Sequence, residues 1–479
     1  MHTLPRRTFL RNSLLATAST IAVTQRGLAA PSEKINAAII GCGGRGKALA
    51  GQVARVPGVS ITWAVDPDET RAKGIAQKYG AKAAQDLRKA LDDKDLDVVV
   101  IATGNYWHCL AGIWACQAGK DVYVEKPLGH NLVEQRRLIE IAAKTKRIVQ
   151  VGTQQRSDVC QDAIRSFLHE EKGLGEIQYI HANRYGVRPP VPMLRGAPLS
   201  IPKEVDYDLW CGPAKKAQLA RNGLHYDWHW DFNTGNGEMG NWGVHILDDV
   251  RNVGLADKVG LPKRILAGGG RLVWKDAAET PNVHFAYYDT GSIPVIFDLT
   301  NLPIKPGSKA SPAHQNIRSG YTVYCEGGRY SGGRGGGAAY DKDGNRIKKF
   351  SGNAGKGHME NFFNAVRSRK SETLKAPVLQ GHYSSGWCEL ANVAYKTGAG
   401  YSKGEAMEIN KGMKAWGDLI DTAQARLEPH GITLDDPKVK LSPVLELDAE
   451  TEKFTGEMAA KANPHLGREY REGFELPEA

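Results

Sequence analysis

The sequence predicts an α/β fold whose N-terminal part is an open parallel sheet. Three observations support this prediction: a glycine-rich turn between a strand and a helix, strands that alternate with helices over residues 35–151, and polar residues that follow the strand ends. A chain of 479 residues is long enough for two or three domains. Its 41% hydrophobic and 24% charged residues are typical of globular proteins and exclude wholesale disorder, a coiled coil or collagen.

The first residues resemble a twin-arginine export signal. Pro5-Arg6-Arg7 begins the motif, a moderately apolar stretch follows at 14–23, and small residues precede a cleavage point after Ala29. That stretch is too short for a transmembrane helix. We expect residues 1–29 to be a signal peptide and the protein to be periplasmic or exported by the twin-arginine pathway. The alternative is a basic N-terminus without a targeting role.

A dinucleotide-binding turn follows the first predicted strand, residues 35–40. The turn reads Gly41-Cys42-Gly43-Gly44-Arg45-Gly46 and leads into a helix over 47–55. In this pattern the first glycine permits a tight turn, the second lets the backbone approach a pyrophosphate, and the third lets the helix pack against the strand. The N-terminus of the helix then faces the phosphates. The alternative is a glycine turn in another kind of α/β protein.

Asp66 directly follows the second predicted strand, residues 59–65. An acid at this place can accept hydrogen bonds from the hydroxyls of an adenosine ribose and would repel a 2′-phosphate. The sequence therefore favours NAD over NADP as the cofactor.

The alternation continues to residue 151. Helices are predicted at 71–79, 87–91, 110–118 and 133–144, and strands at 96–102, 121–124 and 148–151. Ligands bind such sheets at the carboxyl ends of the strands. The predicted cofactor site therefore adds to the glycine turn and Asp66 the residues after later strands: Thr103, Asn105, His108, Glu125, Lys126 and Gln154.

Charge and cysteine content exclude several other functions. Four arginines in residues 1–29 contribute to the net charge of +10, and the remaining charge is not concentrated in one run. We expect no nucleic-acid partner and no integral membrane partner. The seven cysteines form no CxxC pair, so neither a disulfide framework nor a metal is expected.

The segment 228–249 is the densest in aromatic and polar residues. Trp228, Trp230 and Trp242 could stack on the faces of a sugar, or they could be ordinary core residues. A helix is predicted from Glu238 onward, and it would place Asn241, His245 and Asp249 on one face. These six residues form the predicted substrate site. His225, His229 and Asp231 match no strong metal pattern.

These motifs together resemble the Gfo/Idh/MocA oxidoreductases over roughly residues 34–400. The resemblance rests on the glycine turn, Asp66, Thr103-x-Asn105, Glu125-Lys126-Pro127 and a G-x-H-x-x-D segment around His245. It implies a Rossmann domain at 34–155 and an α+β substrate domain with a large, mostly antiparallel open sheet at 156–425. Residues 426–479 would be a C-terminal extension, extended or helical.

The resemblance also implies roles for the catalytic residues. The lysine of Glu-Lys-Pro lies beside the nicotinamide in this family, so Lys126 and His245 are the predicted acid–base pair. Typical members carry an aspartate four residues before the histidine, whereas this chain has Asn241, which becomes an orienting or substrate contact. The alternatives are a capped strand end for Lys126 and a core histidine for His245.

The predicted activity is hydride transfer between a tightly held NAD(P) and a hydroxyl or carbonyl of a sugar or glycoside. A retained cofactor is expected because an exported enzyme meets no pool of free NAD. The alternatives are an NAD-dependent, redox-neutral glycoside hydrolase and a non-catalytic carbohydrate-binding protein. A homo-oligomer is expected from the family resemblance.

Later elements follow from local patterns. Strands are predicted at 175–185, 264–273, 282–288 and 293–299, and helices at 357–367 and 381–396. The glycine-rich residues 327–337 predict a mobile loop.

Overall fold

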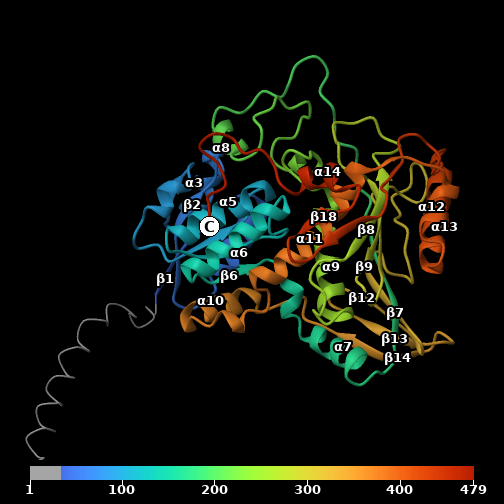
Figure 1. Cartoon of the computed structure of the whole chain (residues 1–479). Coiled ribbons are helices and arrows are strands. Elements are labelled where there is room, and N and C mark those ends of the chain that lie inside the picture. The colour runs from blue at the N-terminus through green and yellow to red at the C-terminus, as the bar shows by residue number, and fades with distance from the viewer. Residues whose placement is uncertain (1–33) are drawn as a thin grey trace, which may run out of the picture. The chain divides into compact units, whose positions relative to one another are not determined.

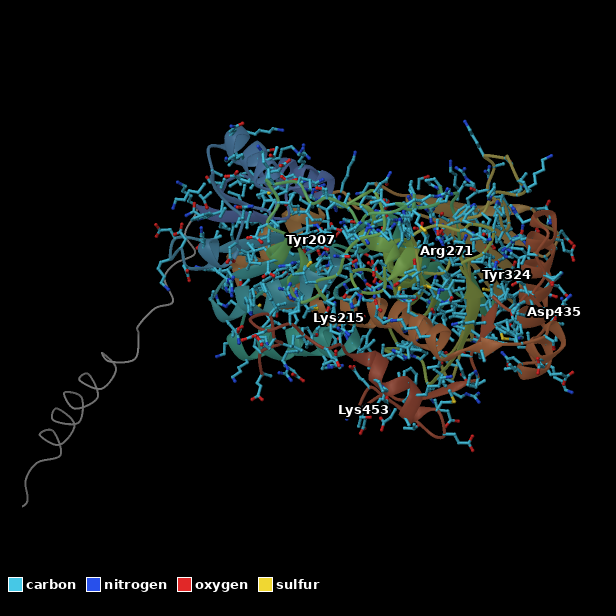
Figure 2. The ribbon with its side chains drawn as sticks, turned by 90° about the horizontal axis from the view of Figure 1, so that it is seen from above. Tyr207, Lys215, Arg271, Tyr324, Asp435 and Lys453 are labelled. Carbon is cyan, nitrogen blue, oxygen red and sulfur yellow. The ribbon has the colours of Figure 1, made fainter. Side chains whose placement is uncertain are left out.

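Two sheets organise the chain in a computed structural model that describes residues 34–479 (Figure 1). The predicted signal peptide lies outside the described residues. Residues Ile35–Ala479 form one compact unit, so the predicted divisions at 155 and 425 stay predictions. Figure 2 shows the parallel sheet with its helices at one end of this unit and Tyr324 and Asp435 at the other.

The N-terminal sheet is parallel, with six strands in the order β3-β2-β1-β4-β5-β6. This order and direction confirm the predicted Rossmann fold. The strands are β1 (Ile35–Ile40), β2 (Val59–Val65), β3 (Lys82–Ala84), β4 (Val98–Ile101), β5 (Asp121–Val124) and β6 (Val149–Val151). The helices between them are α2 (Gly44–Val53), α3 (Glu69–Tyr79), α4 (Arg88–Leu91), α5 (Asn105–Gln117) and α6 (Leu132–Thr145).

Helices cover both faces of this sheet, which explains its nearly continuous apolar strands. Every residue of β4 and β5 is buried. One face packs on α5 and α6, and the other packs on α2, α3 and the later helix α10 (His358–Ser368). The polar residues at the strand ends are therefore held at one edge of a rigid scaffold.

The second sheet is large and mostly antiparallel, as predicted. Its main path is β14-β13-β12-β11-β7-β10-β9-β8-β16-β15, and only β7 and β10 pair in parallel along it. Its first strands are β7 (Ile177–Tyr185), β8 (Arg264–Gly270), β9 (Val283–Asp289), β10 (Val295–Thr300) and β11 (Ser319–Cys325). The later ones are β12 (Gly328–Gly333), β13 (Gly336–Asp341), β14 (Arg346–Ser351), β15 (Ala399–Gly400), β16 (Lys440–Leu441), β17 (Leu445–Asp448) and β18 (Lys453–Thr455).

Two apolar cores flank the large sheet. One includes side chains from α7 (Val159–His169), α9 (Val244–Asp249) and α11 (Val378–Thr397). The other lies under α12 (Lys403–Ile409) and α13 (Lys414–Leu427). The remaining helices are α8 (Tyr207–Cys211) and α14 (Ala459–Ala462).

The mobile loop predicted at 327–337 is wrong, because these residues form most of the β12–β13 hairpin. Glycine is used there to make room for a side chain. A Cβ on Gly332 would lie 2.2 Å from the hydroxyl of Tyr330, and one on Gly337 would lie 2.6 Å from it. The buried Tyr330 ring can cross the hairpin only because both positions lack side chains.

The C-terminal extension is part of the fold rather than an appendage. β16 and β17 pair with β8, so residues after 430 complete the large sheet. The last residues then return to the Rossmann half. There the hydroxyl of Tyr470 donates to Glu134 on α6 (3.0 Å), and the ring of Phe474 lies 5.6 Å from that of Trp107 on α5.

Candidate active site

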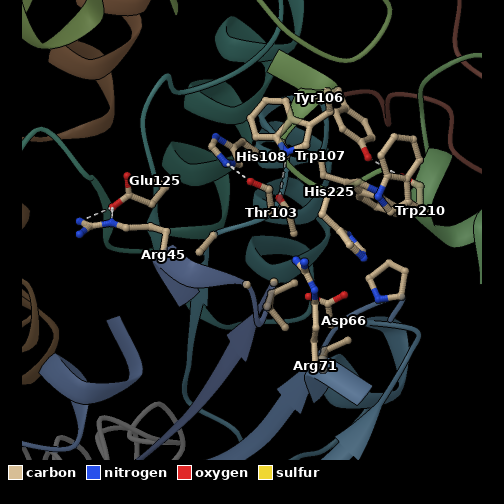
Figure 3. A pocket seen from close by; sticks show the side chains of 18 of the residues that line it. Arg45, Asp66, Arg71, Thr103, Tyr106, Trp107, His108, Glu125, Trp210 and His225 are labelled. Atoms are coloured by element: carbon tan, nitrogen blue, oxygen red, sulfur yellow. Dashed lines mark hydrogen bonds and ion pairs between the residues drawn. The ribbon is translucent and has the colours of Figure 1, made fainter. Parts of the chain in front are cut away.

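A cavity of about 430 Å³ opens at the carboxyl edge of the parallel sheet (Figure 3). Arg45 and Glu125 lie at one end of it, and Asp66, Arg71 and His225 lie at the other. Its walls combine the glycine turn, the ends of β2, β4 and β5, and the irregular segment 209–229. The predicted residues that line it are Gly41, Gly43, Gly44, Arg45, Asp66, Thr103, His108, Glu125, Lys126, Trp228 and Asn241.

The glycine turn fits a dinucleotide. Gly41 has a φ of +88°, and a Cβ there would lie 2.6 Å from the backbone of Ala102. A Cβ on Gly46 would lie 1.8 Å from the carbonyl oxygen of Gly41, so only glycine lets the helix pack this closely. No side chain caps the N-terminus of α2, which leaves its first N–H groups available to a phosphate. Cys42 and Gly46 face the protein interior rather than the cavity.

Asp66 has a structural role that the sequence did not reveal. Its carboxylate accepts the backbone N–H of Cys42 (2.7 Å) and that of Asp68 (2.9 Å), so it fixes the glycine turn. Burial raises the pKa of this carboxyl to about 6. Asp66 also lines the cavity, and its predicted contact with ribose hydroxyls stays a prediction.

The residues after β4 divide between the cavity and the interior. Thr103 and His108 line the cavity, and the ring nitrogens of His108 lie 2.7 Å from the carbonyl oxygen of Pro127 and 3.2 Å from that of Thr103. Asn105 is buried and donates to the side chain of Asn236 instead. It does not line the cavity.

Glu125 pairs with Arg45 across the cavity wall. The Arg45 Nε donates to Glu125 Oε1 over 2.7 Å, which ties the helix after the glycine turn to the end of β5. Gln154 donates to the same oxygen (3.2 Å) without lining the cavity. Gln154 therefore helps to hold the Glu125 carboxylate in place without lining the cavity itself. Sequence reasoning missed the Arg45–Glu125 ion pair because it joins two separate motifs.

Lys126 lies at the end of β5 with its amine against the second half of the chain. Its Nζ donates to the main-chain carbonyl oxygen of Asn241 (2.8 Å) and lies 3.4 Å from the side-chain oxygen of the same residue. Burial lowers the pKa of Lys126 to about 8, although the Glu125 carboxylate opposes this shift. An amine with such a pKa can exchange protons near neutral pH.

The helix predicted from Glu238 contains two wider turns. Residues Met239–Gly243 form a π-helical turn, α9 follows, and Val250–Gly254 form a second π-helical turn. These turns change the angular spacing, so the prediction of one regular helical face is wrong. Asn241 lines the cavity, whereas His245 and Asp249 do not.

His245 is buried beside the Trp242 ring, with ring centroids 5.7 Å apart. Burial lowers its pKa well below the usual value, and the positive charges of Lys126 and Arg334 lower it further. The imidazole is therefore neutral near pH 7. A neutral imidazole can donate from one ring nitrogen and accept at the other.

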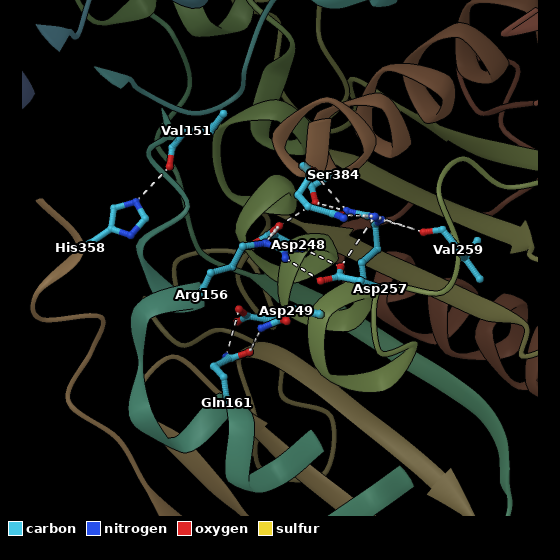
Figure 4. A network of polar contacts seen from close by, with 12 residues as sticks. Val151, Arg156, Gln161, Asp248, Asp249, Asp257, Val259, His358 and Ser384 are labelled. Atoms are coloured by element: carbon cyan, nitrogen blue, oxygen red, sulfur yellow. Dashed lines mark hydrogen bonds and ion pairs between the residues drawn. The ribbon is translucent and has the colours of Figure 1, made fainter. Parts of the chain in front are cut away.

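The two aspartates after His245 belong to a separate buried network (Figure 4). Asp248 accepts from Arg156 (2.7 Å) and from Ser384 (2.7 Å). Asp249 accepts from Gln161 (3.2 Å), and burial raises its pKa well above the usual range. This network joins α9 to α7 and α11, so the structure places Asp249 away from the predicted substrate contacts.

The three tryptophans do not form one platform. Trp228 lines the cavity and stacks on His229, with ring centroids 3.6 Å apart. Trp230 is buried under Arg188, and Trp242 lies under Arg184. Within residues 34–479, no helix has the length and hydropathy to cross a bilayer, and no three metal-ligating side chains converge.

The fold and this edge define a dinucleotide-binding α/β protein. Residues 35–153 match the oxidoreductase family described as an NAD-binding Rossmann fold, and residues 194–298 match the C-terminal α/β domain of the same family. In these two regions the chain is similar to the Gfo/Idh/MocA oxidoreductases.

Curated relatives match only part of this chain. An inositol 2-dehydrogenase of Salmonella typhimurium is 30% identical over 155 residues, which is 32% of this chain and 46% of the relative. A glycosyl hydrolase family 109 protein of Shewanella is 28% identical over 220 residues, which is 38% of this chain and 47% of the relative. The chain thus spans less than half the length of these relatives.

Solved structures share the fold. A putative oxidoreductase of Bacillus subtilis superimposes with a TM-score of 0.55 at 16% identity, over 75% of this chain and 96% of the other. The WlbA dehydrogenase of Bordetella pertussis, solved with NADH and UDP-GlcNAcA, gives a TM-score of 0.53 at 18% identity, over 74% and 93%.

Proposed function

We propose that this protein is an NAD-dependent oxidoreductase that moves a hydride between a tightly held nicotinamide and a hydroxyl or carbonyl of a sugar or glycoside. The position of Lys126 is the observation that carries this proposal. Its amine, with a pKa of about 8, lines the same cavity as the phosphate-binding turn. The candidate proton-transferring group and the candidate nucleotide site therefore line one cavity.

Lys126, Asn241 and His245 would have different roles in this hydride transfer. Bound nicotinamide supplies the hydride acceptor or donor. The neutral amine of Lys126 takes the hydroxyl proton during oxidation and returns it during reduction. The carbonyl oxygen of Asn241 holds that amine in place (2.8 Å). The acid–base role of His245 stays a prediction, because its buried ring does not line the cavity.

Two segments support retention of the cofactor. The segment 199–230 contacts the start of α3, where the Glu69 N–H donates to the carbonyl oxygen of Glu204 (3.0 Å) and the Asp206 N–H donates to that of Pro67 (2.9 Å). The C-terminal residues hold this segment from outside, since Arg471 donates to the carbonyl oxygen of Gly212 (3.2 Å). Release of a bound dinucleotide would require these contacts to open.

The test begins with protein purified without added cofactor. We expect mass spectrometry of the small molecules released on denaturation to find NAD, and sugars added to the native protein to produce the absorbance of reduced nicotinamide. Protein that neither contains nor binds NAD would contradict the proposal. Protein that binds NAD and sugars but transfers no hydride would be the carbohydrate-binding alternative.

Redox-neutral glycoside cleavage is a second candidate, favoured by the similarity to the glycosyl hydrolase family 109 protein. In that reaction a sugar hydroxyl is oxidised, the acidified neighbouring C–H loses its proton, and the glycosidic bond breaks by elimination. Water then adds and the hydride returns, so no net reduced cofactor forms. Release of p-nitrophenol from nitrophenyl glycosides, with deuterium from solvent in the sugar, would identify this reaction.

We also propose export by the twin-arginine pathway and assembly into a homo-oligomer. The sequence of residues 1–29 supports export, and the family resemblance supports an oligomer. Fractionation of cells that express the Arg6→Lys/Arg7→Lys variant tests export, since the variant should stay in the cytoplasm. Light scattering of the purified protein tests assembly.

A further inference from the structure

Two arginines surround the partly exposed ring of Trp242. The Arg184 guanidinium, from β7, lies 4.2 Å from the ring centroid, and that of Arg334 lies 5.9 Å from it. The same ring adjoins His245. This group of residues lies outside the cavity lining and next to Asn241, which lines the cavity.

The carboxylates near this ring do not neutralise its arginines. Glu238 is fully buried and accepts from Arg184 (2.8 Å) and Arg188 (3.2 Å) at once. Its second oxygen also accepts the amide of Asn241 (3.1 Å). The single negative charge of Glu238 therefore pairs with two guanidinium groups, so one positive charge of Arg184 and Arg188 is not neutralised.

Arg334 adds a second uncompensated charge. It stands at the tip of the β12–β13 hairpin, is exposed, and makes no ion pair with any described residue. The Glu125 carboxylate is taken by Arg45. Burial raises the pKa of the Asp249 carboxyl well above its usual range, and this carboxyl accepts from Gln161 rather than from an arginine. The surroundings of His245 therefore carry excess positive charge.

We propose that the sugar recognised by this protein carries an anionic substituent, a carboxylate or a sulfate ester, and that Arg334 binds it beside Trp242 and His245. A guanidinium presents paired N–H donors that match the oxygens of either group. The charge left over from Arg184 and Arg188 favours the same anion. This inference rests on the proposed function, because it names the class of sugar that the same site would take.

The test measures binding to the NAD-loaded protein by calorimetry. The probes are D-glucuronate, D-glucose 6-sulfate and D-glucose, at low and at moderate salt. We expect at least one anionic probe to bind tenfold or more tightly than glucose, and its advantage to shrink as salt screens the charge. The difference between the two anionic probes shows whether a carboxylate or a sulfate is preferred.

Variants assign the effect to one residue. Arg334→Ala should reduce the ratio of anionic to neutral affinity by tenfold or more, and Arg334→Lys should restore part of it. Arg346→Ala is the matched control, because it removes an exposed arginine from the neighbouring strand β14. That control should leave the ratio unchanged.

Three results would overturn the inference: glucose binding as tightly as both anionic probes, no binding of either anionic probe, or an Arg334→Ala variant with an unchanged ratio. If glucose still reduces the nicotinamide in those cases, the proposed function stands alone. If an anionic probe binds through Arg334 without any hydride transfer, the inference stands and the proposed function fails.

Discussion

The amine of Lys126 donates a hydrogen bond to the main-chain carbonyl oxygen of Asn241, 2.8 Å away, although 115 positions separate the two residues. Lys126 follows β5 of the parallel sheet by two residues, and Asn241 lies in the π-helical turn before α9. A carbonyl oxygen can orient the amine whether it is charged or neutral, without the fixed charge of a carboxylate. The two halves of the chain therefore meet at the group on which the proposed chemistry depends.

Replacing Lys126 tests that chemistry. Lys126→Ala should lower the rate of hydride transfer by about 10²–10⁴-fold, the usual effect of a lost acid–base group. NAD binding should persist, because the glycine turn that we expect to hold the phosphates is built from other residues. Lys89→Ala, an exposed lysine on α4, is the control and should keep full activity. A Lys126→Ala protein with native rates of nicotinamide reduction would remove the lysine from the mechanism.

The pH profile should follow the same amine. Oxidation needs neutral Lys126 as the proton acceptor, and burial lowers its pKa from 10.5 to about 8. The rate of oxidation should therefore rise with pH and level off above about 8, and the rate of reduction should fall over the same range. Lys126→Arg should lose the oxidation activity across this range because a guanidinium stays charged. The pH range from roughly 6 to 9 brackets this pKa. An oxidation rate that does not vary over that range would contradict the assignment.

Asn241→Asp introduces the residue that typical family members carry. The new carboxylate would lie beside the Lys126 amine, now 3.4 Å from the side-chain oxygen, and beside Glu238, now 3.1 Å from the amide nitrogen. It should raise the pKa of Lys126 and move the oxidation profile to higher pH. It should also repel Glu238.

A second substitution separates these two effects. Asn241→Asp/Glu238→Gln removes the repulsion while keeping the new charge next to Lys126. We expect the double variant to keep part of the alkaline shift, while its melting temperature also reflects the loss of the Glu238 ion pairs with Arg184 and Arg188. Rate profiles and melting temperatures of the three proteins measure both effects. An Asn241→Asp profile that coincides with the native one would show that this side chain does not tune Lys126.

Local patterns in the sequence were sufficient to predict the Rossmann half and its strand-end residues. Each of these residues follows a buried strand, and parallel strands end at one edge. The large antiparallel sheet followed from the family resemblance. Patterns could not reveal that Asp66 holds the glycine turn or that Asn105 faces Asn236, because both depend on side-chain direction. They also could not predict the π-helical turns, the Tyr330 packing in the glycine hairpin or the return of the C-terminal residues, which are set by long-range contacts.

Cofactor choice should depend on the charge of Asp66. We expect the protein to bind NAD more tightly than NADP, because the carboxylate repels a 2′-phosphate. Its pKa of about 6 means that the carboxyl is ionised at pH 8 and gains a proton as pH falls through about 6. The preference for NAD should therefore shrink at pH 5. Dissociation constants of both cofactors at the two pH values measure this.

Asp66→Ala is the matching variant. This variant should bind NAD and NADP with more similar affinities at pH 8. It should also bind both cofactors more weakly, because the N–H groups of Cys42 and Asp68 lose their acceptor. The ratio of the two constants is therefore the decisive quantity. Equal or tighter binding of NADP by the native protein would contradict the role assigned to Asp66.

The C-terminal residues should control how fast the cofactor leaves. Phe474 packs against Trp107, which lines the cavity, and Arg471 donates to the carbonyl oxygens of Asp208 and Gly212, whose neighbour Trp210 also lines it. Phe474→Ala should loosen both walls, since a buried Phe→Ala change typically costs about 3–5 kcal/mol. We expect NAD to dissociate at least roughly tenfold faster. A tenfold change corresponds to about 1.4 kcal/mol of the lost packing energy, the part that stabilises the cofactor-bound state.

Stopped-flow displacement of bound cofactor measures the rate, with Glu475→Ala, an exposed neighbour, as the control. If Phe474→Ala and Glu475→Ala released NAD at the native rate, the C-terminal residues would serve the stability of the fold alone.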